Sequence, residues 1–410
     1  MNAHLANPLV ECGKPLFFRV APTAELDSIA APIRLGDAIR LSVRSLSVMQ
    51  KEALVFNARS GETWRLASDE GAYLAGLDEA PCPLSFLTTG MVSATMNELL
   101  ALARQRRIHI EAIRLVQDNY YTMKGSARAG TMTGGAKDVH LTAQIAGSAD
   151  HDTLQKLVLD ATIASPLNGL MRGAKESLFS LTHNGAQIQP DHAIALPGTA
   201  EPDPGDLFAA AMPAEGDWSN LVRRGGKSPK VEHTVTMAND SLSDEQNRLL
   251  HIRGICTLRE DGVKQIEQQL FNPHGSIFHF LSDEPVAAGG QGLAPDAASY
   301  ISAGIGFCFM TQFGRYAKIT GADLRDYRIL QDTHFSLGGA SSDTGKAGHA
   351  DPIETHVYLE TGEDDAFARK ALDMAEQTCF LHAFCRTDLK TRVAVHDYSD
   401  EISVPMPVAV

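Results

Sequence analysis

The chain has 410 residues, of which 44% are hydrophobic and 21% charged, a composition typical of a globular protein with about two domains. Its 36 basic and 50 acidic residues give a net charge of -14, which disfavours nucleic acid and anionic membrane surfaces as partners. Six cysteines are too few for a secreted disulfide scaffold, and no apolar run is long enough to span a bilayer. With no signal-peptide pattern at the start, we expect a cytoplasmic protein.

The first half of the chain begins with a β-rich stretch that ends at Ser68-Asp69-Glu70. Residues 84–103 are apolar with a single charge, which predicts a helix that is buried on every side. The elements expected after it are strands at 110–116, 139–145 and 179–181 and a helix at 152–163. Residues 196–216 are rich in Pro, Gly, Ala and acidic residues, as is typical of a linker.

The second half shows the same order of patterns. A turn is expected at 272–275, and a second buried helix at 298–317 with Asp296 as its N-cap. The other elements expected are strands at 250–258, 263–270, 276–281, 324–330, 353–359 and 392–396 and a helix at 364–376.

The two halves are related by a constant offset. Ser68-Asp69-Glu70 recurs as Ser282-Asp283-Glu284, 214 residues later, and Ala80-Pro81 recurs as Ala294-Pro295 at the same offset. We therefore predict two repeats, at 1–200 and 226–410, joined by a linker at 201–225. The predicted fold class is α+β, each repeat being a curved antiparallel sheet with a buried central helix, and the repeats form a pseudo-dimer. Whether this pseudo-dimer pairs again as a homodimer stays open.

Two segments of the second repeat carry a family resemblance: APDAASYISAGIGFCFMTQFGRYA and ALDMAEQTCFLHAF. They resemble the OsmC/Ohr family, whose small α+β subunits form intertwined dimers. That family has one cysteine in the central helix and a second at the start of a later helical turn, and Cys308 and Cys379 match these positions. The resemblance covers about 35–185 and 240–400 and is more specific in the second repeat.

The resemblance implies a peroxiredoxin-like oxidoreductase of the stress response that reduces organic hydroperoxides without a cofactor or metal. Cys308 would attack the O–O bond, Cys379 would resolve the sulfenic acid as a disulfide, and an external dithiol would reduce that disulfide. An apolar substrate pocket is expected from four large side chains around the cysteine: Tyr300, Phe307, Phe309 and Met310.

The first repeat lacks these thiols. At the offset of 214, Cys308 corresponds to Ala94 and Cys379 to Ser165. Cys82 lies twelve residues before Ala94 and does not match the family position. We therefore expect the first repeat to be structural and the second to hold the chemistry.

A buried thiol needs a positive partner to ionise. The family has an Arg for this purpose, oriented by a Glu ten residues before the first cysteine, but Ala298 stands at that position here. The candidates to replace this Glu are Asp283, Glu284 and Asp296. For the Arg, the best match is His279, whose counterpart at the offset is Arg65. We hypothesise that Arg65 or His279 lies near Cys308, the alternative being that both are ordinary charges on the strand surface.

Two further interpretations compete with the redox one. Free cysteines are often small core residues, so the pair could be structural. The chain would then be a non-catalytic protein that binds another apolar small molecule between its two central helices.

The glycine-rich stretch 338–346 lacks the spacing of a phosphate-binding loop and is expected to connect two strands. The histidines are scattered, so no metal site is expected.

Overall fold

The computed structural model describes residues 6–27, 30–47, 49–231, 241–399 and 401–402. The elements of the first half are α1 (Pro8–Glu11), β1 (Phe18–Arg19), α2 (Ala24–Asp27), β2 (Gly36–Ser47), β3 (Gln50–Asn57), β4 (Glu62–Ser68), α3 (Pro83–Gln105), β5 (Ile110–Ser126), β6 (Thr133–Ala136), β7 (Val139–Gly147), α4 (His151–Ala164), β8 (Leu178–His183), β9 (Ala186–Ile188) and α5 (Leu207–Ala210). Those of the second half are β10 (Val222–Lys227), β11 (Glu245–Leu258), β12 (Lys264–Asn272), β13 (Ser276–Ser282), α6 (Ala297–Thr320), β14 (Leu324–Ser336), β15 (Glu354–Thr361), α7 (Asp365–Thr378), α8 (Phe380–Arg386) and β16 (Thr391–Asp397).

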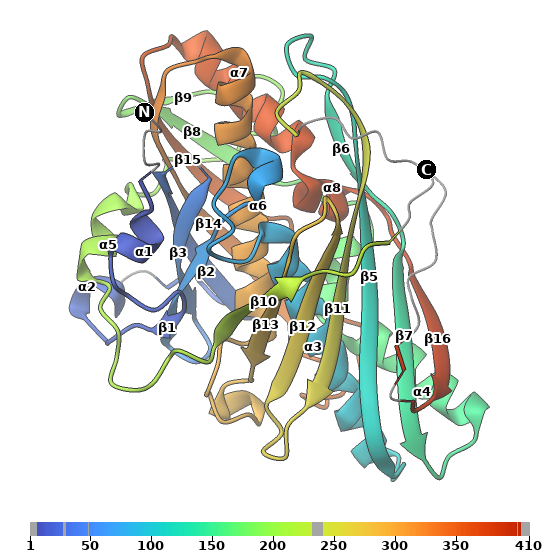
Figure 1. Ribbon diagram of the computed structural model, residues 1–410. Helices are drawn as coiled ribbons and strands as arrows, with labels where there is room; N and C mark the ends of the chain where they lie inside the picture. Colours follow the sequence, from blue (N-terminus) through green and yellow to red (C-terminus); the bar gives the residue numbers. More distant parts are fainter. Residues whose placement is uncertain (1–5, 28–29, 48, 232–240, 400, 403–410) are drawn as a thin grey trace.

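The predicted α+β class is confirmed, because two large sheets enclose the long helices α3 and α6 (Figure 1). The first sheet has the order β1-β4-β3-β2-β14-β15-β8-β9. The second has the order β10-β13-β12-β11-β5-β7-β16, with β6 paired to β5. Helix α6 packs on β2, β3 and β14 of the first sheet, and α3 packs on β5, β11 and β12 of the second.

Each sheet combines strands from both halves of the chain, whereas we expected one sheet for each repeat. In the first sheet β2 pairs with β14, and in the second β11 pairs with β5. The sheets are also not purely antiparallel, because β8 pairs parallel with β15 and β7 parallel with β16. Helix α6 of the second half packs closely on β2 of the first, since a Cβ on Gly306 would lie 2.3 Å from Cδ2 of Leu41.

Corresponding elements begin 214 residues apart, as the sequence offset predicts. The pairs are β4 and β13 (from 62 and 276), α3 and α6 (from 83 and 297), and α4 and α7 (from 151 and 365). Asp296 caps α6 as predicted, since its carboxylate accepts the backbone N–H of Ser299. The repeat boundaries themselves stay a prediction.

The two central helices touch through glycines. A Cβ on Gly90 of α3 would lie 2.5 Å from the carbonyl oxygen of Ala297, and one on Gly304 of α6 would lie 2.8 Å from the backbone nitrogen of Leu87. Both helices are buried on nearly all sides, which explains why each is apolar around its whole circumference.

The stretch expected to be a linker contains the short helix α5. Phe208 of α5 is buried in a small cluster with Phe18, Val20 and Leu54, so part of this connection packs against the first sheet.

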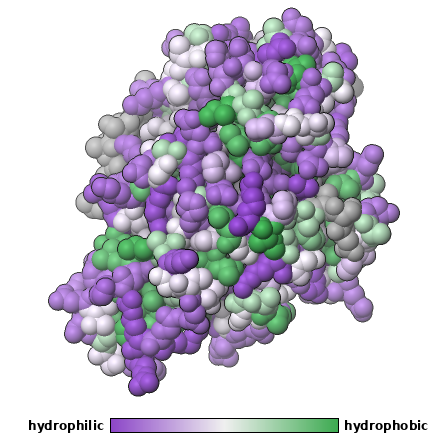
Figure 2. Space-filling model, turned by 180° about the vertical axis from the view of Figure 1, so that it is seen from behind, coloured by the Kyte–Doolittle hydropathy of each residue, from purple (hydrophilic) through white to green (hydrophobic). Residues whose placement is uncertain are grey.

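The face shown in Figure 2 is mostly hydrophilic, with hydrophobic side chains in small separate patches. Among the described residues, none of the helices has the length and apolar character that crossing a lipid bilayer requires.

The contact between α3 and α6 gives a first prediction. Gly304→Ala should destabilise the protein by about 2 kcal/mol, because the new methyl group meets backbone atoms that cannot move without separating the helices. Urea denaturation followed by far-UV circular dichroism measures this. Gly226→Ala on β10 is the matched control, since no atom lies within 4 Å of its Cβ position. Equal stability of Gly304→Ala and wild type would contradict the close contact.

Candidate thiol site

Cys308 and Cys379 are held by helices on two sides of the core. Cys308 lies in the middle of α6 with 2% of its surface exposed, and Cys379 is fully buried at the junction of α7 and α8. The Cys379 sulfur accepts the backbone N–H of His382 at 3.5 Å and so caps α8.

The two thiols interact, since Cys379 is among the groups that shift the pKa of Cys308. Burial raises the pKa of the Cys308 thiol, and the neighbouring Cys379 thiol and the charge of Glu70 raise this pKa further. The backbone N–H of Leu381 lowers the same pKa, because it donates a hydrogen bond to the sulfur. Cys308 is therefore a neutral thiol at neutral pH in this conformation.

A small cavity of about 30 Å³ lies beside Cys308. Apolar side chains such as Leu84, Leu250 and Phe380 form part of its wall, and the polar part comes from Glu70, Tyr73, Cys82, Thr311, Arg248 and Arg315. A volume of this size is about that of one water molecule.

Two buried ionisable side chains, Lys51 on β3 and Glu70 after β4, also interact with Cys308. The Lys51 ammonium donates to the carbonyl oxygen of Met49, and Glu70 accepts hydrogen bonds from Tyr73 (2.8 Å) and Thr311 (3.1 Å). Burial lowers the pKa of Lys51 and raises the pKa of Glu70, and in each case the partner's charge acts in the opposite direction. The first half thus contributes charged groups to a site whose thiols belong to the second.

The residues expected to replace the family Glu lie elsewhere. Asp283 and Glu284 line a different cavity, beside α3, and Asp296 caps α6. Glu70, the equivalent of Glu284 in the repeated Ser-Asp-Glu string, is the acid at the thiols. The sequence repeat contained this signal, but identifying it also required knowing that the halves exchange strands.

Arg65 and His279 do not line the cavity beside Cys308. Arg65 is buried and donates to Glu52 at 2.7 Å and to the backbone oxygens of Pro15 and Leu16. His279 is partly exposed, and its Nδ1 lies 3.9 Å from Oε2 of Glu267.

Sequence reasoning missed Arg315, although it follows Cys308 by seven residues and thus lies on the same face of α6. Its Nε donates to the carbonyl oxygen of Ser241 at 2.7 Å.

The four side chains expected to form a substrate pocket are core residues instead. Tyr300, Phe307, Phe309 and Met310 are fully buried, and none lines the cavity beside Cys308. Phe307 packs on Phe86 of α3 at 5.1 Å between ring centres. Because α3 and α6 are in direct contact, these residues point into the helix interface and the sheets.

Of the other cysteines, Cys82 lines the same cavity as Cys308, and burial raises its pKa to about 12. Burial also raises the pKa values of Cys256 and Cys385 to about 12, and Cys12 is exposed.

Within the described ranges, two clusters have ligand atoms at metal-like spacing: Asp191, His192 and Asp373, and Asp332, His334 and Glu354. In the second, Arg40 already pairs with Asp332 at 2.6 Å and Arg34 with Glu354 at 2.8 Å.

The fold and the paired thiols define an α+β protein with a buried dithiol site. Residues 289–393, which include both cysteines, match the family described as OsmC-like protein, so this part of the chain is OsmC-like. A comparison with curated proteins found no match.

Two solved structures are among those similar to parts of the chain. One is an OsmC-like hydroperoxide resistance protein from Jannaschia sp. CCS1, with 18% identity and a TM-score of 0.20, covering 32% of this chain and 83% of that one. The other, from Psychrobacter arcticus 273-4, is described as an osmotic stress induced and detoxification response protein. It has 20% identity and a TM-score of 0.22, and the match covers 30% of this chain and 82% of that one.

The buried pair gives a prediction for stability. Lys51→Met should destabilise the protein by about 3 kcal/mol, because it leaves the Glu70 carboxylate buried without its counter-charge. The double variant Lys51→Met/Glu70→Gln should recover part of this loss, as measured by urea denaturation. Lys156→Met on α4 is the control, since its side chain is 72% exposed and a surface change of this kind costs under about 0.5 kcal/mol. Strict additivity of the two substitutions would show that the groups do not interact.

Proposed function

We propose that this chain is a thiol-dependent hydroperoxide reductase in which Cys308 is the attacking thiol and Cys379 the resolving one. The observation that supports this best is the proximity of the two buried thiols, which interact with each other and of which Cys308 faces a cavity. A disulfide needs its two sulfurs to meet, and free cysteines that serve only as core residues have no need for such a contact.

The proposed reaction has three steps that balance. The Cys308 thiolate attacks the terminal oxygen of ROOH, the O–O bond breaks, and ROH leaves after taking up a proton, so that Cys308 becomes a sulfenic acid. The Cys379 thiol then attacks the Cys308 sulfur and releases water, giving a disulfide. An external dithiol reduces this disulfide by exchange and is itself oxidised.

Positive charge near the sulfur supports the first step. Lys51 interacts electrostatically with Cys308, Arg315 lines the cavity beside it, and the Leu381 N–H already donates to the sulfur. These groups stabilise a thiolate that burial alone disfavours. In this proposal they stabilise the thiolate, the role that the family resemblance assigns to an Arg and for which Arg65 and His279 were our candidates.

The size of the cavity favours small substrates. A space of about 30 Å³ is closer to the size of hydrogen peroxide than to that of a bulky organic hydroperoxide, which requires the side chains around it to move. The alternative function, binding of an apolar ligand between the central helices, has less support. The backbones of α3 and α6 approach each other at Gly90 and Gly304, and no space remains between the helices there.

Thiol titration tests the proposed roles directly. One equivalent of hydrogen peroxide should lower the titratable thiols of the denatured wild type from six to four, because one disulfide forms. Cys308→Ser should keep its remaining thiols, and Cys379→Ser should accumulate a sulfenic acid that dimedone labels at Cys308. Cys385→Ser is the matched control, because Cys385 lies on α8, the helix that Cys379 caps. This variant should still form the disulfide between Cys308 and Cys379. Thiol loss in Cys308→Ser at the wild-type rate would refute the proposal.

The raised pKa of Cys308 gives the pH dependence. Because its thiolate fraction grows with pH, the rate constant for peroxide consumption should rise across about pH 6 to 9 without a plateau near neutrality. Stopped-flow measurement of a single turnover gives this profile. Lys51→Met should be slower at each pH, since it lacks a charge that stabilises the thiolate. A plateau below pH 7 would mean that Cys308 is already ionised and that burial does not control its reactivity.

A further inference from the structure

A second cavity lies beside α3, at the position equivalent to the thiol site. It has a volume of about 340 Å³ and is lined by Ala94 and Asn97, which stand 214 residues before Cys308 and Thr311. The hydrogen bonds correspond as well: Asn97 donates to Glu284 at 2.6 Å, just as Thr311 donates to Glu70. Lys264 on β12 lies 3.9 Å from Glu284, in the role that Lys51 has beside Glu70.

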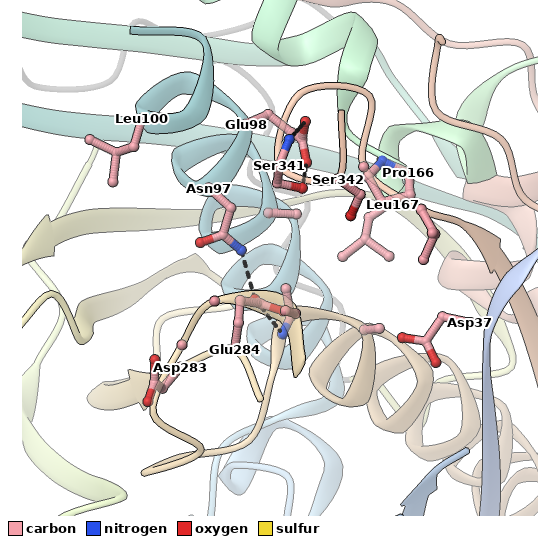
Figure 3. Close-up of a pocket in the computed structure, with 18 of the residues that line it drawn as sticks. Asp37, Asn97, Glu98, Leu100, Pro166, Leu167, Asp283, Glu284, Ser341 and Ser342 are labelled. Atoms are coloured by element: carbon pink, nitrogen blue, oxygen red, sulfur yellow. Dashed lines mark hydrogen bonds between the residues drawn. The ribbon is translucent and has the colours of Figure 1, made fainter. Parts of the chain in front are cut away.

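The two cavities differ in size and chemistry. Ala94 offers no sulfur, and the volume beside it is within the range of sites that bind small molecules. One part of the wall is apolar and consists of Leu100, Pro166, Leu167, Phe335 and Leu337. Figure 3 shows Pro166 and Leu167 on one side of the cavity and Glu284 and Asp37 on the other.

The charged part of the wall is acidic overall. Five carboxylates line the cavity, against three cationic side chains: Asp37, Glu98, Asp261, Asp283 and Glu284 against Arg59, Arg104 and Lys264. Glu98 and Asp283 are occupied by hydrogen bonds from Ser341 and from the backbone of Gln291. Among the described residues, the hydrogen bonds to the Glu284 carboxylate all end on Oε1, which leaves Oε2 available to a ligand.

The carboxylates on this side repel one another, although Arg59 and Lys264 lie near them. Burial raises the pKa of Asp37 to about 6, and the charge of Glu284 adds to this shift. Burial and the charges of Glu284 and Asp37 together raise the pKa of the neighbouring Asp296 to about 7. A bound cation would relieve this repulsion, and the net charge of -14 attracts cations to the protein from a distance.

We infer that the cavity beside Ala94 binds an aliphatic amine, with the ammonium group at Asp37 and Glu284 and the alkyl chain against Leu100, Pro166 and Leu167. The inference does not depend on the proposed peroxide chemistry, because neither Cys308 nor Cys379 lines this cavity.

A series of five-carbon compounds whose end groups are positively charged, neutral or negatively charged tests the ligand class. Isothermal titration calorimetry of the full chain should detect binding of 1,5-diaminopentane, and 1,5-pentanediol should bind at least about tenfold more weakly because it lacks the charge. Glutarate, with two negative charges, should not bind. Equal binding of diamine and diol, preferential binding of glutarate, or no binding of the diamine would each overturn the inference.

Matched variants locate the site. Glu284→Gln should weaken diamine binding about tenfold while keeping the hydrogen bond from Asn97, and Asp37→Asn should act in the same direction. Glu70→Gln is the control, because it removes the equivalent carboxylate from the thiol cavity and should leave diamine binding unchanged. Circular dichroism establishes that each variant is folded. If Glu70→Gln weakened binding and Glu284→Gln did not, the amine would occupy the other cavity and the inference would be wrong.

Discussion

The close contact between α3 and α6 is the constraint on which the other features of this molecule depend. Gly90 and Gly304 let the two helix backbones approach, and each helix then presents its outer side to one sheet. A helix enclosed in this way has no solvent-facing side, so it must be apolar around its circumference. Any polar or reactive group on it, such as Cys308, is therefore buried by the architecture itself.

Strand exchange gives each site residues from both halves of the chain. The thiols of the second half lie beside Lys51 and Glu70 of the first, and Ala94 of the first half lies in a cavity with Lys264 and Glu284 of the second. The lysine and glutamate of each half therefore lie beside the central helix of the other half. The stability of the fold and the composition of both sites thus depend on the same interface.

The sequence predicted the elements well and their assembly less well. The apolar helices, the cap at Asp296 and the 214-residue spacing are local or periodic features, and the structure has them where expected. The offset cannot indicate which hairpin covers which helix, because exchanged and unexchanged sheets use the same strands. For that reason Glu284 was considered near Cys308, where Glu70 lies. Lys51 carried no local signal, since a lysine on a strand is usually exposed.

The two positions related by the 214-residue offset are free to differ, because both belong to one chain. In a symmetric homodimer both sites share every residue, so a substitution changes the two sites together. Here position 308 is Cys while its counterpart 94 is Ala, and position 311 is Thr while its counterpart 97 is Asn. A lysine and a glutamate interact at both places, Lys51 with Glu70 and Lys264 with Glu284, whereas the group facing each cavity differs. One cavity is small and contains thiols, and the other is wide and acidic. The two positions related by the 214-residue offset therefore differ in the volume, charge and reactive groups that they present.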